Sequence, residues 1–216
     1  MYTPPKFAVS DEDIATALAE ARFAHLVTHT HAGLVVTPLP LMYDAERHEL
    51  IGHVARANPH SEAAGAESVA IFAGPQAYVS PSLYATKAET GKVVPTWNYE
   101  ILTVHGHLGV HDDPAWVLDL VTRLTELHER DRVQPWRVSD APETFTSAQL
   151  RAIVGVSLPV ERVEAKAKMS QNQPARNRAG VVDGLAASES GADQAVSARV
   201  AALDPDRGST NANGRG

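Results

Sequence analysis

The 216-residue sequence contains no cysteine. A disulfide framework, a thiol nucleophile and a thiolate metal site are therefore excluded, because each of them needs this side chain. Histidine, with ten copies, remains as a candidate metal ligand. His29 and His31 stand two residues apart, as do His105 and His107, so each pair would share one face of a strand. Neither pair has an acidic residue at a spacing that would make it a third ligand. The sequence therefore predicts no metal site.

The sequence also lacks any run of lysines or arginines. It carries 19 Lys and Arg against 26 Asp and Glu, a formal net charge of −7. Proteins that bind DNA tightly neutralise phosphates with clustered cations. The composition therefore disfavours tight, autonomous DNA binding and leaves a local patch on a dimer as the alternative.

Long apolar stretches are absent as well. No segment approaches the roughly 20 apolar residues of a membrane span, and residues 1–6 lack the apolar core of a signal peptide. With 44% apolar and 21% charged residues, the composition is that of a globular chain. We expect a soluble, cytoplasmic protein with no membrane partner.

Several common catalytic and nucleotide motifs are missing. Neither G-x-G-x-x-G nor G-x-x-x-x-G-K-[ST] occurs, which disfavours a Rossmann or P-loop nucleotide site. The G-x-S-x-G elbow of serine hydrolases is also absent. The sequence accordingly predicts no catalytic residues.

What is present is a series of short β-like runs separated by tight turns. This spacing is typical of an antiparallel barrel or sandwich. The runs cover residues 23–28, 34–41, 50–55, 68–72 and, after a break at Gly74-Pro75, 77–79. Further along we expect a loop over 81–95, a strand over 96–110, a helix from Asp113-Pro114, a short helix over 147–153, a strand over 155–165 and a helical segment over 184–203.

Two prolines, Pro38 and Pro40, lie inside the second run. Because proline cannot donate a ladder hydrogen bond, this run is predicted at a sheet edge or a bulge. A cofactor lying along a broken sheet edge would exploit that gap.

The stretch Leu50–Ser61 is chemically the most suggestive. An apolar strand carries His53 and Arg56 and then meets Asn58-Pro59, a favoured pair for a helix N-cap and first helical position. A helix N-terminus offers unpaired N–H groups that suit an anion such as phosphate. We therefore expect an anion-binding turn here, with a structural turn as the plain alternative.

Taken together, several motifs resemble the PaiB-type, FMN-binding negative transcriptional regulators. The matching pieces extend over residues 1–203 in the order of that family. They are Met1-Tyr2-Thr3-Pro4, Thr37-Pro38-Leu39-Pro40, G-H-V-A-R-A-N-P-H at 52–60, G-P-Q-A-Y-V-S-P-S-L-Y at 74–84, V-P-T-W-N-Y at 94–99, V-H-G at 104–106, K-M-S-Q-N at 168–172 and Gly184-Leu185. One departure is Leu83-Tyr84, where the family often has Trp-Tyr.

The resemblance implies an α+β, mainly β fold, the FMN-binding split β-barrel with flanking helices. It also implies a homodimer with FMN at the subunit interface. Arg56 and Asn58 would hold the FMN phosphate, and the other implied cofactor residues are Thr37, Pro38, His53, Ala55, Trp97, Asn98, Tyr99, Lys168, Ser170 and Gln171. We expect one domain over 1–203, with 183–203 as a C-terminal helical extension, and a disordered tail over 204–216.

The function implied by the resemblance is negative transcriptional regulation by an FMN-binding homodimer, through DNA or a regulatory partner protein. A flavin-dependent oxidoreductase on the same barrel is the alternative, with His53 and His105 as candidate acids. A barrel that has lost its flavin and serves as an interaction module is a third.

Overall fold

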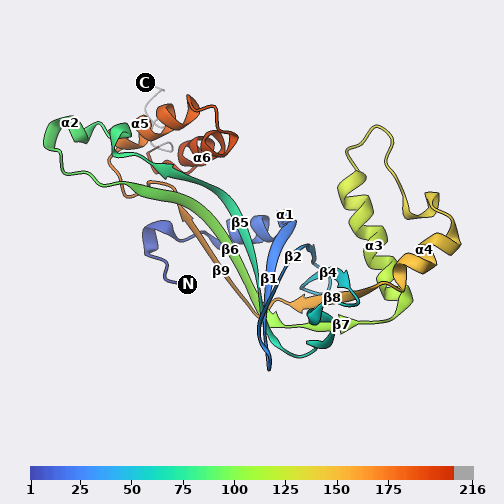
Figure 1. The fold of residues 1–216 in the computed structure, drawn as a ribbon. Helices are drawn as coiled ribbons and strands as arrows, with labels where there is room; N and C mark the ends of the chain where they lie inside the picture. The colour runs from blue at the N-terminus through green and yellow to red at the C-terminus, as the bar shows by residue number, and fades with distance from the viewer. Residues whose placement is uncertain (207–216) are drawn as a thin grey trace, which may run out of the picture. The chain divides into compact units, whose positions relative to one another are not determined.

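The computed structural model describes residues 1–206 (Figure 1). The chain divides into two compact units. Unit 1 comprises residues 1–11, 73–102 and 165 onward, and unit 2 comprises residues 12–72 and 103–164. Each unit is described by itself below.

Nine strands within the described chain form two sheets. The five-stranded sheet has the order β2-β1-β5-β6-β9, and the four-stranded sheet has the order β3-β4-β8-β7. The ladders with a defined register are antiparallel. The strands are β1 (Phe23–Thr30), β2 (Gly33–Pro40), β3 (Met42–Asp44), β4 (Glu49–Ala55), β5 (Glu67–Val79), β6 (Thr96–His107), β7 (Gly109–His111), β8 (Ile153–Pro159) and β9 (Arg162–Lys168).

Helices flank these sheets. Those of unit 2 include α3 and α4, whereas α5 and α6 pack against each other in unit 1 (Figure 1). The α-helices are α1 (Asp11–Glu20), α2 (Thr86–Thr90), α3 (Pro114–Glu129), α4 (Glu143–Leu150), α5 (Ala175–Ala186) and α6 (Gly191–Ala202). The 3-10 helices are η1 (Pro5–Phe7), η2 (Pro59–Glu62), η3 (Pro81–Leu83) and η4 (Val138–Asp140).

Strand β2 confirms the prediction made from its prolines. It lies at the edge of the five-stranded sheet and pairs with β1, with Pro38 opposite His25 and Pro40 opposite Phe23. An edge strand has one side without a neighbouring strand, so the missing N–H groups cost no ladder bond. The edge position leaves this segment free to border a site.

The expected break at Gly74-Pro75 is wrong, because β5 runs through it without interruption. A Cβ added to Gly74 would lie 2.8 Å from the Cβ of Glu100. Gly74 therefore lets β5 approach Glu100 of β6 closely, and it does not end the strand as we had expected.

Two predicted long strands are each divided. The 96–110 strand splits into β6 and β7 at Leu108, whose backbone exchanges hydrogen bonds with Gly65 and Ala66. The 155–165 strand splits into β8 and β9 at residues 160–161. Val160 N–H there donates to His48 O. This bond extends the β4–β8 pairing by one residue beyond the pair of Glu49 and Pro159.

Some helix boundaries were predicted correctly and others were not. The helix from Asp113-Pro114 is confirmed as α3, with the Asp113 carboxylate accepting from Ala115 N–H at 3.1 Å. The short helix over 147–153 is wrong in position, since α4 begins at Glu143. The 81–95 loop contains η3 and α2, and the 184–203 segment belongs to two helices separated before Gly191.

Each unit has its own buried apolar cluster. In unit 1 it joins the end of β5 to α5 and α6, through Ala77, Val79, Tyr84, Met169, Val181, Leu185, Val196 and Val200. In unit 2 it joins β3 and β4 to α3, through Met42, Ile51, Leu120 and Leu124. The predicted single domain over 1–203 stays a prediction.

The predicted tail lies outside the described residues from 207 on. Its first residues are described, and Arg178 donates hydrogen bonds to the carboxylates of Asp204 and Asp206. Arg178 itself is buried. These bonds tie the residues directly after α6 to α5.

Candidate functional site

The twelve predicted cofactor residues divide equally between the two units. Unit 2 holds Thr37, Pro38, His53, Ala55, Arg56 and Asn58. Unit 1 holds Trp97, Asn98, Tyr99, Lys168, Ser170 and Gln171. The two sets therefore form one cluster in each unit.

In unit 2, the edge strand β2 presents Thr37 on one face and Pro38 on the other, as strand alternation requires. Thr37 is half-buried on the same face as the buried Leu39. Its hydroxyl accepts a hydrogen bond from the Asn58 side-chain amide at 3.0 Å. This hydrogen bond joins the turn after β4 to the edge strand.

Asn58 caps the 3-10 helix η2, as predicted. Its Oδ1 accepts from His60 N–H at 3.0 Å, and Pro59 follows at the first helical position. The remaining N–H groups of the turn are also bonded, with Asn58 N–H on Ala55 O and Ser61 N–H on Asn58 O. The expectation of unpaired N–H groups at this turn is therefore wrong. At this turn, side chains therefore remain as the hydrogen-bond donors for an anion.

Arg56 is held by three groups within unit 2. Its guanidinium makes a two-pronged contact with Asp112, at 2.9 and 2.5 Å, and donates to the carbonyl oxygens of Arg151 and Ile153. The hydrogen bond with Asp112 raises the pKa of Arg56, and the same bond lowers the pKa of Asp112. Both side chains are exposed, at 46% and 66%. An incoming phosphate would meet a guanidinium that is already oriented and would compete with one carboxylate.

Strand β4 places His53 and Ala55 opposite Gly155 and Ile153 of β8. The His53 ring is half-buried, and its Nδ1 has no hydrogen-bond partner among residues 1–206. Burial lowers the pKa of His53, so the ring is neutral at neutral pH. Because Nδ1 is itself buried, it can bond a ligand only if the ligand displaces the atoms that cover it.

In unit 1, the predicted side chains are largely bonded to one another and to the backbone. Asn98 and Ser170 are both buried, and the Asn98 amide donates to Ser170 Oγ at 3.0 Å. Ser170 adopts φ = 64°, a left-handed conformation that is uncommon for a non-glycine residue. The buried bond holds the chain after β9 against β6.

Lys168 and Gln171 are engaged in the same region. The Lys168 ammonium donates to Thr96 Oγ1 and to Trp97 O. The Gln171 side chain accepts from Met169 N–H at 2.7 Å and donates to Ala167 O at 2.8 Å. Burial lowers the pKa of Lys168.

The aromatic residues of unit 1 are the more accessible members of the set. Trp97 is 48% exposed and lies against Tyr78, with ring centroids 6.2 Å apart. The Lys166 ammonium stands 5.2 Å from the Tyr99 ring centroid. A planar ring could stack on this surface, whereas Asn98 and Ser170 are buried.

Two residues of the unit 2 cluster were missed by sequence reasoning. His60 lies within hydrogen-bond distance of both Thr37 and Asn58, and Asp112 pairs with Arg56. His60 belongs to the quoted G-H-V-A-R-A-N-P-H stretch, so its place two residues after the N-cap was an available signal. Asp112 lies 56 positions from Arg56, and nothing local connects them.

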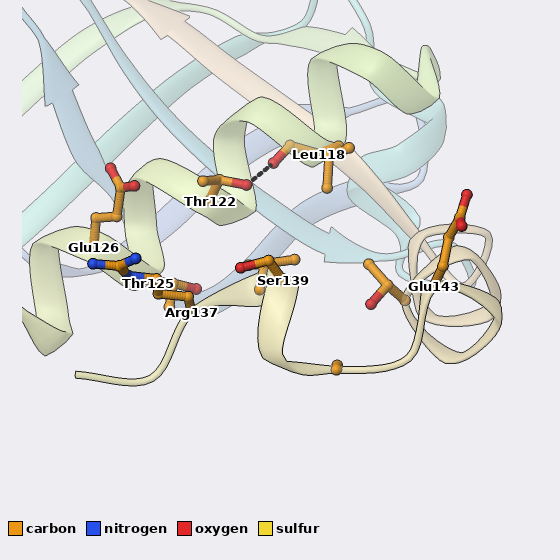
Figure 2. A pocket seen from close by; sticks show the side chains of 10 residues that line it. Leu118, Thr122, Thr125, Glu126, Arg137, Ser139 and Glu143 are labelled. Atoms are coloured by element: carbon orange, nitrogen blue, oxygen red, sulfur yellow. Dashed lines mark hydrogen bonds between the residues drawn. The ribbon is translucent and has the colours of Figure 1, made fainter. Parts of the chain in front are cut away.

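A separate hollow of about 520 Å³ lies in unit 2, between α3 and the η4–α4 segment. Figure 2 shows Glu126 and Arg137 toward one end of it and Glu143 toward the other. The Thr122 hydroxyl is committed to Leu118 O at 2.7 Å. None of the twelve predicted residues lines this hollow.

Residues 1–206 contain no group of three or more His, Asp or Glu side chains placed to hold a metal ion. Within the same described range, every helix is too short or too polar to cross a lipid bilayer.

A family model described as "Putative FMN-binding domain" matches residues 1–162. The chain belongs to this family. The resemblance identified from the motifs is therefore confirmed, and so is FMN as the cofactor that the family's description names. The match includes the whole unit 2 cluster and ends before Lys168.

The chain is also similar to individual curated proteins. The chain is 29% identical to protease synthase and sporulation protein PAI 2 of Bacillus subtilis, over 86% of this chain and 89% of that protein. It is 34% identical to an uncharacterized protein of Aspergillus fumigatus, over 63% of this chain. The chain spans 65% of the length of that fungal relative.

Among solved structures, the FAD and heme binding protein from Mycobacterium smegmatis aligns with a TM-score of 0.56 and 17% identity. The alignment covers 76% of this chain and 73% of that one. At this identity the likeness shows a shared fold. The predicted α+β, mainly β split-barrel class is confirmed.

The unit 2 residues suit the phosphate end of such a cofactor. Arg56 offers charged N–H donors, Asn58 an amide and Thr37 a hydroxyl, and a phosphate is an acceptor of all three. His53, on β4, adds a buried nitrogen that has no hydrogen-bond partner among residues 1–206. The chemistry of this donor set therefore fits the family's cofactor.

Proposed function

We propose that this chain binds FMN as a homodimer and acts as a negative transcriptional regulator. The observation that carries the cofactor part is the donor cluster of Thr37, Asn58 and Arg56 in a chain of an FMN-binding family. A bound flavin supplies redox chemistry, while the protein binds and orients it. In this proposal Arg56 and Asn58 hold the phosphate, and Thr37, Pro38, His53 and Ala55 border the rest.

The absorption spectrum of the purified protein tests the cofactor. The protein is soaked in FMN and desalted, and retention of the flavin band with about one FMN per chain is the expected result. Riboflavin, which lacks the phosphate, serves as the matched ligand and should be retained less. Loss of the band for both ligands would reject the proposal.

The homodimer is supported by an exposed apolar face on β1 and β2. Phe23, Leu34 and Val36 are 59%, 71% and 56% exposed. They belong to one face, because Phe23 pairs with Pro40 and Val36 with Val27, at even spacing along each strand. An exposed apolar strand at a sheet edge commonly marks an interaction surface.

Sedimentation velocity tests this surface. The variant Leu34→Glu/Val36→Glu should sediment as a monomer, because two buried charges at the interface would be unpaired. The control is Val133→Glu, at a fully exposed position in the same unit. A dimeric Leu34→Glu/Val36→Glu variant would place the interface elsewhere.

The regulatory role rests on the PaiB-type resemblance and on the similarity to PAI 2 of B. subtilis. With a net charge of −7, we expect regulation through a partner protein more than through tight, autonomous DNA contact. A gel shift in physiological salt should show no nanomolar, sequence-specific complex. Observing such a complex would establish direct DNA binding.

The flavin-dependent oxidoreductase alternative is kept because His53, a member of the predicted cofactor set, has a buried nitrogen with no hydrogen-bond partner among residues 1–206. The other candidate acid, His105, lies 3.1 Å from the Glu164 carboxylate. Bleaching of the flavin band by NADH or NADPH, with turnover on an added acceptor, would favour this alternative. A flavin band that persists under the same conditions favours the regulator.

A further inference from the structure

Three side chains of unit 2 form a closed hydrogen-bonded group, Thr37, Asn58 and His60. His60 Nδ1 lies 3.0 Å from Thr37 Oγ1 and 3.1 Å from Asn58 Oδ1. Asn58 Nδ2 donates to Thr37 Oγ1 at 3.0 Å, and Asn58 Oδ1 accepts from His60 N–H at 3.0 Å. His60 has no exposed surface, and its Nε2 has no hydrogen-bond partner within the described residues.

Burial lowers the pKa of His60, so the ring is neutral at neutral pH and carries one proton. Two tautomers are then available, and both give three hydrogen bonds within the group. They differ in which hydrogen is left without an acceptor.

In the first tautomer the proton is on Nδ1 and is donated to Asn58 Oδ1. The two lone pairs of Oδ1 are then filled by the His60 N–H and the ring N–H. The Thr37 hydroxyl already accepts from Asn58, and the acceptor in the group that lies nearest its own hydrogen, Asn58 Oδ1 at 3.4 Å, is already filled. Because Thr37 is only half-buried, that hydrogen can point to water or to a ligand.

In the second tautomer the proton is on Nε2, and Nδ1 accepts from the Thr37 hydroxyl. The unused donor is then a ring N–H that is fully buried with no acceptor among residues 1–206. Nε2 has no partner within the described chain in either tautomer, as a bare acceptor in the first and as an N–H donor in the second, and each state has a cost. The first tautomer is favoured because its unused hydrogen, on the half-buried Thr37 hydroxyl, can be donated to water or to a ligand, which adds one hydrogen bond that the second tautomer lacks.

We propose that His60 is a positioning residue for the cofactor site: as the Nδ1–H tautomer it saturates Asn58 Oδ1 and directs the Thr37 hydroxyl hydrogen toward a ligand oxyanion. This inference rests on the proposed FMN function for the identity of the ligand. Its consequence is selectivity, because Thr37 then acts as a donor and favours an acceptor such as a phosphate oxygen over a ligand N–H.

The tautomer itself is measured by nitrogen-15 NMR of the full chain labelled at histidine. The His60 signals are assigned by their loss in His60→Asn. In the protein without ligand, Nδ1 should be the protonated nitrogen, and the same state should persist with FMN. Protonation on Nε2 in either sample would overturn the proposal. This measurement does not depend on whether FMN binds.

A double-mutant cycle on FMN affinity tests whether His60 acts through Thr37. Thr37→Val should weaken FMN binding by about tenfold, the size of one hydrogen bond to a charged acceptor. His60→Leu should weaken it similarly, because the Thr37 hydroxyl then turns to Asn58 Oδ1, which lies 3.4 Å away. The double variant should bind as Thr37→Val does, whereas losses that multiply would show that His60 acts independently and would overturn the proposal.

The conservative variants complete the test. Thr37→Ser keeps the hydroxyl, and His60→Asn places an amide N–H where Nδ1–H stands, so both should retain FMN affinity within about threefold. Loss in His60→Asn equal to that in His60→Leu, with melting temperatures unchanged, would contradict the tautomer argument. If wild-type protein binds no FMN, the proposed function fails while the NMR result still decides the orientation of Thr37.

Discussion

The six predicted cofactor residues of unit 2 and the six of unit 1 differ in what their polar atoms are bonded to. In unit 2, Arg56 is exposed, Thr37 is half-buried, and His53 has a nitrogen with no hydrogen-bond partner among the described residues. In unit 1, Asn98 and Ser170 are enclosed and bond each other. A polar residue in a family motif can therefore either bind the ligand or stabilise the fold. A buried polar residue that is hydrogen-bonded to another buried residue is expected to stabilise the fold.

The largest expected effect is on the stability of unit 1. Asn98→Ala should lower the free energy of unfolding by about 2–3 kcal/mol, because it leaves the buried Ser170 hydroxyl without its amide partner. Urea denaturation provides the measurement, and Asn172→Ala, at an exposed position nearby, is the control. FMN affinity should stay within about twofold, corrected for unfolded protein. A large loss of affinity at unchanged stability would move Asn98 into the ligand site.

The corresponding substitution in unit 2 should affect FMN binding and leave stability almost unchanged. Arg56→Ala is expected to weaken FMN binding about 10- to 100-fold, the size of a charged hydrogen bond to phosphate. Its exposed ion pair with Asp112 contributes little to folding, so stability should hardly change. Fluorescence titration with FMN measures the affinity, and Arg151→Ala is the matched control. Unchanged affinity in Arg56→Ala would remove Arg56 from the phosphate site.

The two units should also differ in acid sensitivity. Burial lowers the pKa of His53, His60 and His111, and all three belong to unit 2. Below the ordinary value of 6.5 the unfolded chain binds protons that the folded chain resists, so stability falls as pH falls. Each group contributes at most about 1.4 kcal/mol per pH unit.

Hydrogen exchange between pH 7 and pH 5, corrected for the intrinsic rate, separates the units. Protection should fall more in β4 and β8 than in α5 and α6. Equal losses in both units would show that other groups dominate the acid response.

The smallest expected effect concerns Asp112. Asp112→Asn should raise FMN affinity about three- to fivefold, because a phosphate would no longer compete with a carboxylate for Arg56. Isothermal titration gives the comparison, with Asp131→Asn as an exposed change of equal charge in the same unit. A decrease would mean that Asp112 holds Arg56 in its binding orientation.

Local signals predicted several elements correctly. Asp113-Pro114 begins α3, Asn58-Pro59 begins η2, and the prolines of β2 place it at a sheet edge. Each of these follows from the chemistry of one or two adjacent residues. The errors arose where a distant segment took part, as at Gly74, where the neighbouring strand needs the space.

By itself, the sequence determined the class of fold, the family, the lack of thiol chemistry and the turn that carries Asn58. These depend on composition, short motifs and capping, which act over a few residues. Only the tertiary structure decided that Arg56 is paired with Asp112, and that Asn58 and His60 are hydrogen-bonded to Thr37 of the edge strand. Hydrogen bonds between segments far apart in the chain follow from packing, and no local pattern encodes them.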